Sequence, residues 1–119
     1  MADSNAEADC LFCRIIAGEI PSDRVFEDDD VIAFRDIAPR APTHVLVVPR
    51  RHVPDAHSLT DADDALLGRL FGAIRTIADA AGLERGYRVV TNVGPESGQT
   101  VFHLHLHLLG GRPMAWPPG

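Results

Sequence analysis

The longest run of periodic hydrophobicity in the chain has the repeat of an α-helix. Across residues 60–81 the apolar positions recur every three or four residues and form one stripe, which contains Leu67, Leu70, Phe71, Ile74, Ile77, Ala78 and Ala81. Thr60 or Ser58 suits the N-cap of such a helix, and Gly82 suits its end. We therefore expect one long amphipathic helix that buries this stripe.

Shorter apolar runs have the alternating or Val-rich character of β-strands. Strands are predicted over residues 25–26, 31–36, 44–48, 87–93 and 101–109. A short helix is predicted from Cys10, ending before Gly18 and Pro21. Short loops between strands, together with one long helix, predict an α+β fold with an antiparallel sheet of about five strands. Such a sheet leaves an open edge, which a second copy of the chain would cover.

The composition is typical of one globular domain and narrows the possible chemistry. The 119 residues carry a formal net charge of -6, so the overall field does not attract nucleic acid or anionic membranes, and any phosphate site must be local. All 11 basic residues are Arg, which excludes a lysine Schiff base, a nucleotidyl-lysine and a P-loop lysine. We expect a flexible tail over residues 1–9 and a single domain over residues 10–119.

The expected compartment is the cytoplasm. No apolar run approaches the roughly 20 residues of a membrane span, and the polar, acidic start lacks the pattern of a signal peptide. No contact with membranes or nucleic acid is therefore predicted. In a reducing compartment, the pair Cys10 and Cys13 indicates metal binding or redox chemistry rather than a structural disulfide.

The most informative motif is HLHLHLL, which places His103, His105 and His107 at alternate positions. On a strand the three imidazoles share one face, and the leucines between them share the other. Folding has no need of three imidazoles in a row. Near neutral pH, imidazole can act as a nucleophile, donate a hydrogen bond or supply a proton, as phosphoryl transfer requires. The row is therefore predicted to line an elongated phosphate ligand.

The loop before this row, GPESGQT at residues 94–100, fits the same interpretation. Gly94 and Gly98 let the backbone approach a ligand closely, and Thr100 adds a hydroxyl. Backbone N–H groups near Gly98 to Val101 can accept a phosphate without Mg²⁺. By itself the loop is also compatible with an ordinary turn.

With these motifs the chain resembles the histidine-triad (HIT) family, whose signature is His-x-His-x-His followed by apolar residues. The segments EIPSDRVFEDD, VIAFRDIAPRAPTHVLVVPRRH and GYRVVTNVGPESGQTVFHLHLHLLGG, with the ending WPPG, are similar to its nucleotide-binding (HINT) branch. The likeness runs from about Cys10 to the C-terminus. It implies a homodimer in which two sheets join into one, with the long helices packed at the interface.

The resemblance also implies an activity, the cleavage of a P–N bond in an AMP or GMP conjugate by a purine nucleoside phosphoramidase. By matching positions, His105 attacks phosphorus and forms a nucleotidyl-histidine, which water then hydrolyses. His107 binds the phosphate and assists proton transfer to the amine. Thr100 stands where many relatives have Ser, and His44 lies behind the row as a supporting partner.

The same matching assigns the nucleotide contacts. Asp36 is assigned to the ribose hydroxyls. The other contacts are Ile20, Phe34 and Ile37 around the base, and Asn92, Gly98 and Val101 at the phosphate. Trp116 is expected near the partner's site, where it influences the leaving group; a plain anchor for the tail is the alternative.

The motif Cys10-Leu-Phe-Cys13 departs from many HINT relatives. In a subset of HIT proteins such a pair binds structural zinc together with two histidines, which match His52 and His103 here. Cys₂His₂ is a sound tetrahedral donor set. Zinc at this site would remove His103 from the catalytic row.

Other functions stay open at this point. The second enzyme hypothesis is a dinucleoside polyphosphate hydrolase, against which the WPPG ending argues. A third hypothesis is a nucleotide-binding regulatory module with weak catalysis. A fourth is a metalloenzyme with His103 and His105 as metal ligands. A nucleotidyl transferase is disfavoured, because the related transferases have Gln at the position of His107. The sequence decides neither the physiological substrate nor adenine against guanine.

Overall fold

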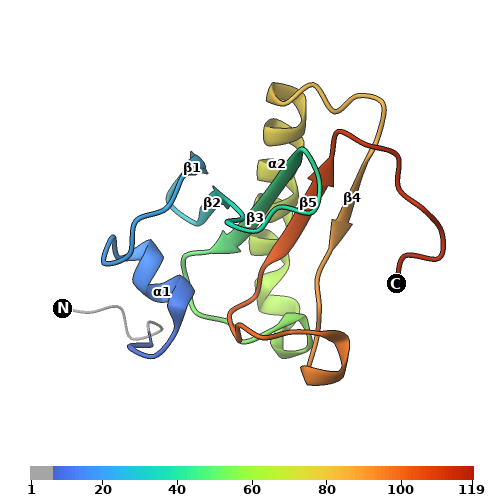
Figure 1. Cartoon of the computed structure of the whole chain (residues 1–119). Helices are drawn as coiled ribbons and strands as arrows, with labels where there is room; N and C mark the ends of the chain where they lie inside the picture. Colours follow the sequence, from blue (N-terminus) through green and yellow to red (C-terminus); the bar gives the residue numbers. More distant parts are fainter. Residues whose placement is uncertain (1–6) are drawn as a thin grey trace.

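The structure is a computed structural model that describes residues 7–119. This part of the chain contains two α-helices and five strands (Figure 1). In chain order they are α1 (Leu11–Ile16), β1 (Arg24–Glu27), β2 (Val31–Arg35), β3 (Thr43–Pro49), α2 (Asp64–Ala80), β4 (Tyr87–Val90) and β5 (Leu106–Gly110). Single 3₁₀ turns lie at Ala56–Ser58, Asp61–Asp63 and Pro95–Ser97. The predicted α+β class, with a sheet of five strands, one long helix and one short helix, is confirmed.

The five strands form one antiparallel sheet in the order β1-β2-β3-β5-β4. β5 therefore enters between β3 and β4, and β1 and β4 are the two edges. In the register of β3 and β5, Leu46 lies opposite His107 and His44 lies opposite Leu109. Because side chains alternate along a strand, the side chains of His44, Leu46 and His107 share one face of the sheet.

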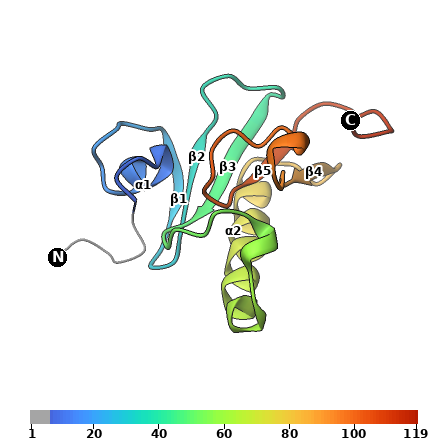
Figure 2. The same cartoon turned by 90° about the horizontal axis from the view of Figure 1, so that it is seen from below.

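The two faces of the sheet are covered differently. α2 packs on one face, where its buried residues form a core with Val45, Val47, Leu104, Leu106 and Leu108. On the opposite face, α1 packs through Phe12 and Ile15 against side chains of β2 and β3. Figure 2 shows α2 along one side of the sheet and α1 beside β1 and β2. The histidines therefore lie on the α1 face.

The long helix begins later than predicted, and its stripe is shifted. A 3₁₀ turn precedes it, where the Thr60 side chain accepts a hydrogen bond from the backbone and the Asp63 carboxylate accepts one from the N–H of Thr60. The helix ends before Gly82, whose φ of 69° is accessible mainly to glycine. Ala73 belongs to the buried face, whereas the predicted stripe residues Phe71 and Ala81 are exposed.

The strand predicted over residues 101–109 is wrong at its start. β5 begins only at Leu106, and β4 ends at Val90 instead of Val93. The reason is that hydrogen bonds outside the ladder tie down the preceding residues. The hydroxyl of Thr91 donates to the carbonyl of His105 at 2.8 Å, and the N–H of Leu104 donates to the carbonyl of Val53. The alternation of side chains nevertheless continues, since Leu104 still lies in the α2 core.

Most of the predicted N-terminal tail, residues 1–6, lies outside the described part of the chain. Within residues 7–119, neither helix has the length and hydropathy that crossing a bilayer requires. The C-terminal tail extends away from the sheet in both views and carries Trp116, which is 82% exposed (Figures 1 and 2).

Candidate active site and metal centre

The row of histidines divides into two clusters on the α1 face of the sheet. His105 and His107 lie together, with ring centroids 5.0 Å apart, and His44 lies beside His107 at 5.2 Å. His103 lies on the same face but contacts His52, with ring centroids 5.0 Å apart. The two clusters have different partners and therefore different chemistry.

A backbone carbonyl fixes the tautomer of His105. Its Nδ1 lies 2.7 Å from the carbonyl oxygen of His103, so that Nδ1 carries the proton and donates it. The Nε2 atom then carries the lone pair that a nucleophile needs. The ring is 7% exposed and meets the Phe12 ring edge to face, with centroids 5.0 Å apart. His105 is thus held on two sides.

A second chain of hydrogen bonds fixes the opposite tautomer in His107. The N–H of Arg40 donates to Nδ1 of His44 at 3.0 Å, which places the proton of His44 on Nε2. This Nε2–H donates to Nδ1 of His107 at 2.9 Å. Neutral His107 therefore carries its own proton on Nε2. His105 and His107 together offer one lone pair and one N–H, as displacement at phosphorus needs.

Burial keeps these imidazoles neutral in the ligand-free protein. Desolvation lowers the pKa of His105, and desolvation followed by the neighbouring His105 and His44 lowers the pKa of His107 to about 4. The pKa of His44 is also lowered, first by desolvation, while the nearby Asp36 carboxylate opposes this shift. A neutral His105 is nucleophilic, and a bound anionic phosphate would raise the pKa of His107.

Asp36 stands at the edge of this cluster, just after β2. One carboxylate oxygen accepts the N–H of Ala38 at 2.8 Å, and the other lies 3.5 Å from Nε2 of His44. Asp36, His44 and His107 each offer an atom within 4.8 Å of the others. Since His44 directs its N–H to His107, the second carboxylate oxygen keeps acceptor capacity for a hydroxyl.

The residues predicted around the base are only partly brought together. Phe34 is 4% exposed and packs edge to face on Phe12, with ring centroids 5.5 Å apart. Ile20 is half-buried against the same cluster. Ile37 is fully exposed, so its place in a base pocket stays a prediction. Leu11, at the start of α1, is 43% exposed beside this cluster.

The predicted phosphate loop is held by a residue that the sequence did not single out. Gln99 is 4% exposed; its side-chain oxygen accepts the N–H of Gly94 at 2.8 Å, and its amide donates to the carbonyl of Pro54 at 2.9 Å. Gly98 has a φ of 98°, which favours glycine. The loop therefore has a defined shape. Thr100 is exposed, and Asn92 and Val101 are half-buried.

The second cluster gathers the four predicted metal ligands. Cys10, Cys13, His52 and His103 each offer one atom, and these atoms all lie within 4.8 Å of one another. The nitrogen atoms Nδ1 of His52 and Nδ1 of His103 are 3.2 Å apart. The sulfur–nitrogen separations are 3.3 Å from Cys13 to His52, and 3.4 and 3.5 Å from Cys10 and Cys13 to His103.

These separations fit a tetrahedral metal. With Zn–N near 2.0–2.1 Å and Zn–S near 2.3 Å, the edges of a tetrahedron are about 3.4 Å between nitrogens and about 3.6 Å between nitrogen and sulfur. His103 donates Nε2–H to the carbonyl of Pro49 at 2.8 Å, which leaves a lone pair on Nδ1. Nε2 of His52 lies 3.4 Å from a Glu7 oxygen, so a proton on Nε2 has an acceptor nearby when Nδ1 binds a metal. A cation between the four ligand atoms would satisfy both nitrogens at this separation.

The properties of the two cysteine thiols also favour a metal site. Burial raises the pKa of Cys13 to about 11, so this thiol ionises at neutral pH only with a cation beside it. A buried, high-pKa thiol is a poor redox nucleophile, which argues for metal binding over the redox alternative. Cys10 lies just before α1, and its sulfur accepts the N–H of Cys13 at 3.3 Å.

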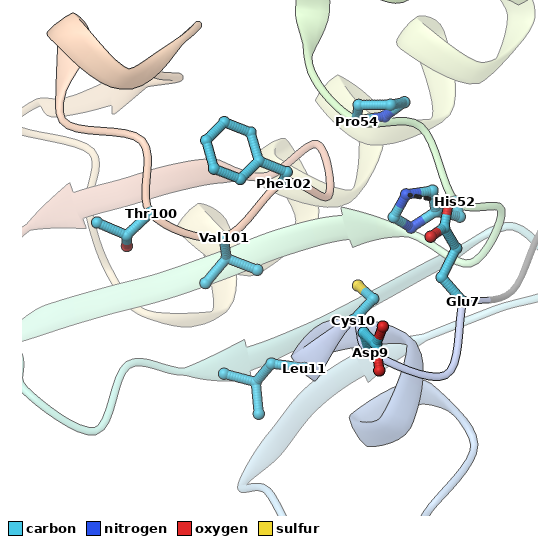
Figure 3. A pocket seen from close by; sticks show the side chains of 9 residues that line it. All are labelled: Glu7, Asp9, Cys10, Leu11, His52, Pro54, Thr100, Val101 and Phe102. Atoms are coloured by element: carbon cyan, nitrogen blue, oxygen red, sulfur yellow. Dashed lines mark ion pairs between the residues drawn. The ribbon is translucent and has the colours of Figure 1, made fainter.

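A pocket of about 410 Å³ opens on this cluster (Figure 3). Cys10 and His52 form part of its wall, Glu7 and Asp9 add carboxylates, and Thr100 to Phe102 form the opposite side. It lies between the start of α1 and the segment that leads into the histidine row. The cluster is thus reachable from solvent in the folded protein.

Comparison with known proteins agrees with this architecture. Residues 17–114 match the sequence model of the HIT domain. An uncharacterized HIT-like protein of Synechococcus elongatus is 53% identical over 111 residues, covering 93% of this chain and 97% of that protein. The crystal structure of a HIT family hydrolase from Legionella pneumophila Philadelphia 1 superposes with a TM-score of 0.92 at 52% identity, over 93% of this chain and 100% of that one. A HIT family hydrolase from Clostridium thermocellum gives 0.90 at 43% identity, over 92% and 96%.

Proposed function

Because the chain belongs to the HIT domain family, we propose that it is a nucleotide-binding hydrolase that cleaves the P–N bond of purine nucleoside phosphoramidates. The observation that carries the proposal is the pairing of opposite tautomers in adjacent rings. His105 presents a lone pair on Nε2, and His107 presents an N–H on Nε2, with the rings 5.0 Å apart. Nucleophile and proton donor are thereby provided side by side.

In the first step, Nε2 of His105 attacks phosphorus and the P–N bond breaks. The anionic phosphate favours protonation of His107, whose pKa is about 4 in the ligand-free protein. Protonation places a hydrogen on Nδ1 of His107, and the displaced N–H of His44 turns to the Asp36 carboxylate, 3.5 Å away. The His107 imidazolium then gives its Nε2 proton to the departing nitrogen and becomes neutral. The products are a free amine and a nucleotidyl group on His105.

In the second step, water attacks the same phosphorus and its proton passes to Nε2 of neutral His107. The bond between phosphorus and His105 breaks, and the lone pair returns to Nε2 of His105. The nucleoside monophosphate leaves. Thr100 and the backbone N–H groups near Gly98 and Val101 bind the phosphate oxygens throughout, so that no Mg²⁺ is needed.

The nucleotide is proposed to lie along the α1 face. The free carboxylate oxygen of Asp36 accepts the ribose hydroxyls. The base stacks against the apolar group around Phe34, namely Ile20 and Ile37, and Asn92 completes the phosphate end. A slot with this apolar lining takes adenine or guanine.

The metal proposed for the second cluster is zinc, bound by Cys10, Cys13, His52 and His103. When bound, zinc supplies a structural crosslink between α1, the segment after β3 and the segment before β5. It takes no part in the two steps above. Thiolate ligands need a reducing compartment, which is consistent with a cytoplasmic protein.

The proposed assembly is a homodimer formed through β4 and α2. β4 is an edge strand, and Tyr87 on it is 42% exposed; Phe71 on α2 is 48% exposed. A second copy would cover both and extend the sheet. Trp116 in the exposed tail is then free to reach the site of the partner.

The proposal is tested by steady-state cleavage of AMP and GMP conjugates of a primary amine, compared with a diadenosine polyphosphate. Wild type is expected to prefer the P–N substrates, and His105→Ala is expected to lose turnover while still binding AMP. His57→Ala, which changes an exposed histidine, is the matched control. Preference for the polyphosphate favours the other hydrolase branch, and AMP binding without wild-type turnover favours a regulatory binding module.

A further inference from the structure

His103 takes part in both clusters through different groups. Its side-chain Nδ1 faces Cys10, Cys13 and His52. Its main-chain carbonyl accepts the Nδ1–H of His105 at 2.7 Å. One residue therefore connects the metal ligands with the proposed nucleophile.

The surroundings of His103 leave its ring little freedom except on the metal side. The ring is fully buried, and Nε2–H donates to the carbonyl of Pro49 at 2.8 Å. The next peptide is held by the N–H of Leu104, which donates to the carbonyl of Val53. Phe12, one residue from the Cys13 ligand, has its ring 6.0 Å from His103 and 5.0 Å from His105.

The segment that carries these two histidines is not held by a β-ladder. β5 begins at Leu106, so His103 and His105 depend on individual contacts for their position. Nδ1 of His52 and Nδ1 of His103 lie 3.2 Å apart, and both can direct a lone pair at one site only when a cation occupies it. Without a cation, only weak S–H donors on Cys10 and Cys13, or a proton moved onto Nδ1 of His52, can satisfy the His103 ring, so the contacts that hold this ring depend on the metal.

We propose that a divalent metal at Cys10, Cys13, His52 and His103 positions the nucleophile by fixing the His103 carbonyl. With the metal bound, the carbonyl stays in place and keeps His105 in the tautomer with its proton on Nδ1. Without the metal, the carbonyl moves and His105 samples the tautomer with its proton on Nε2, which has no lone pair to attack phosphorus. His103 is a positioning residue, and this inference rests on the proposed role of His105.

The structure makes the comparison of loaded and metal-free protein feasible. The pocket of about 410 Å³ opens on Cys10 and His52, so a metal can exchange without unfolding of the chain (Figure 3). The described part of the pocket is also separate from the His44–His107 pair, which does not line it. Removal of the metal therefore leaves the proposed proton donor intact.

The experiment compares the full-length protein loaded with zinc, stripped with a chelator, and reloaded. Long-range ¹H–¹⁵N NMR of the histidine rings reports the tautomer of His105, and a single-turnover assay with an AMP–amine conjugate reports nucleotidyl transfer. Zinc-loaded protein is expected to show one His105 tautomer, and stripped protein a mixture. Transfer should slow by about 10- to 100-fold, the effect of a misplacement of up to about 1 Å, and recover on reloading, while the Kd for AMP changes by less than about threefold.

Two substitutions of the ligand His52 distinguish the effect of losing the metal from the effect of losing side-chain packing. His52 is a ligand that does not contact His105, and Cys₃His is also a sound zinc set. His52→Cys is expected to keep zinc, the single tautomer and the transfer rate; His52→Ala is expected to lose all three while remaining folded by circular dichroism. Both remove the imidazole, so loss of packing alone would affect them alike.

The inference would be overturned if the protein did not bind stoichiometric zinc. It would also be overturned if stripped protein and His52→Ala both kept a single His105 tautomer and an unchanged transfer rate. The NMR arm does not depend on turnover. A zinc-dependent tautomer in a protein that cleaves no conjugate would support the coupling and refute the proposed function.

Discussion

Nε2 of His44 lies 2.9 Å from Nδ1 of His107, on a neighbouring strand of the same sheet face. The bond has a direction, because the N–H of Arg40 occupies Nδ1 of His44 and leaves Nε2 to donate. The proton of neutral His107 is therefore aimed away from His44. A backbone group in the turn before β3 thus decides which face of the proton donor meets the substrate.

Removal of the donor at His44 is expected to slow the chemical step. His44→Leu should lower kcat by about 10- to 100-fold, part of the 10²–10⁴-fold that a positioned acid contributes, with little change in KM. His44→Gln, whose amide can donate to His107, should retain more activity. Equal losses in both variants, measured with the AMP–amine conjugate, would show that the direction of this bond is irrelevant.

Acid is expected to destabilise the fold through His107. Its pKa is about 4 in the folded protein and about 6.5 in the unfolded chain, so between these values the unfolded chain binds more protons. Stability is fully present above pH 6.5 and is lost as the pH falls towards 4. Urea unfolding at pH 7.5 and pH 5.0 should show a loss of roughly 1 to 2 kcal/mol from this residue, after discount for its partial exposure.

The control for this pH effect is His107→Leu, whose unfolding free energy should change less between the two pH values than that of wild type. Wild type and variant must be compared in the same metal-loading state, because the cysteine ligands also bind protons. Identical pH dependence in the two proteins would mean that His107 is protonated equally in both states.

The start of α2 makes a measurable contribution to stability. The Thr60 side chain caps the 3₁₀ turn that leads into the helix, with Asp63 completing the capping box. Thr60→Ala should lower the free energy of unfolding by about 1 kcal/mol. Thr76→Ala, on the exposed side of the same helix, is the matched control and should be neutral or slightly stabilising, because Ala favours helix.

The proposed dimer interface can be disrupted at one residue. Phe71 is exposed on α2, and Phe71→Arg places a charge where a second copy is proposed to pack. Sedimentation velocity should show a dimer for wild type and a monomer for this variant. Ala17→Arg, an exposed change next to α1, should stay dimeric. A monomeric wild type would refute the assembly.

The fold was predictable because its elements carry strong local patterns. The helical repeat of residues 60–81 and the alternation of HLHLHLL each define which side chains are buried. The start of β5 was not predictable, because Leu104 and His105 bond to Val53 and Thr91, which are distant in sequence. The exposure of Phe71 was missed because an apolar stripe on a helix does not show which of its residues are buried within one copy of the chain.

The grouping of several candidate site residues was predictable, but their hydrogen bonds were not. Alternation and the family motif predicted that His105 and His107 lie side by side, and their rings are in contact in the structure. The four predicted metal ligands also lie close together. Phe12 and Gln99 were missed, since an apolar residue in a short helix and a glutamine in a loop have many ordinary uses. The tautomers depend on the carbonyl of His103 and the N–H of Arg40, which no side-chain pattern encodes.

The most direct test of His105 as the nucleophile is to trap the intermediate. Wild type is mixed with an AMP–amine conjugate, quenched within one turnover in alkaline denaturant, which preserves phosphohistidine, and digested for tandem mass spectrometry. The proposed mechanism predicts a nucleotidyl group on the peptide of residues 89–119, located at His105 and absent from His105→Ala. An adduct on His107 or His103, or full turnover by His105→Ala, would contradict it.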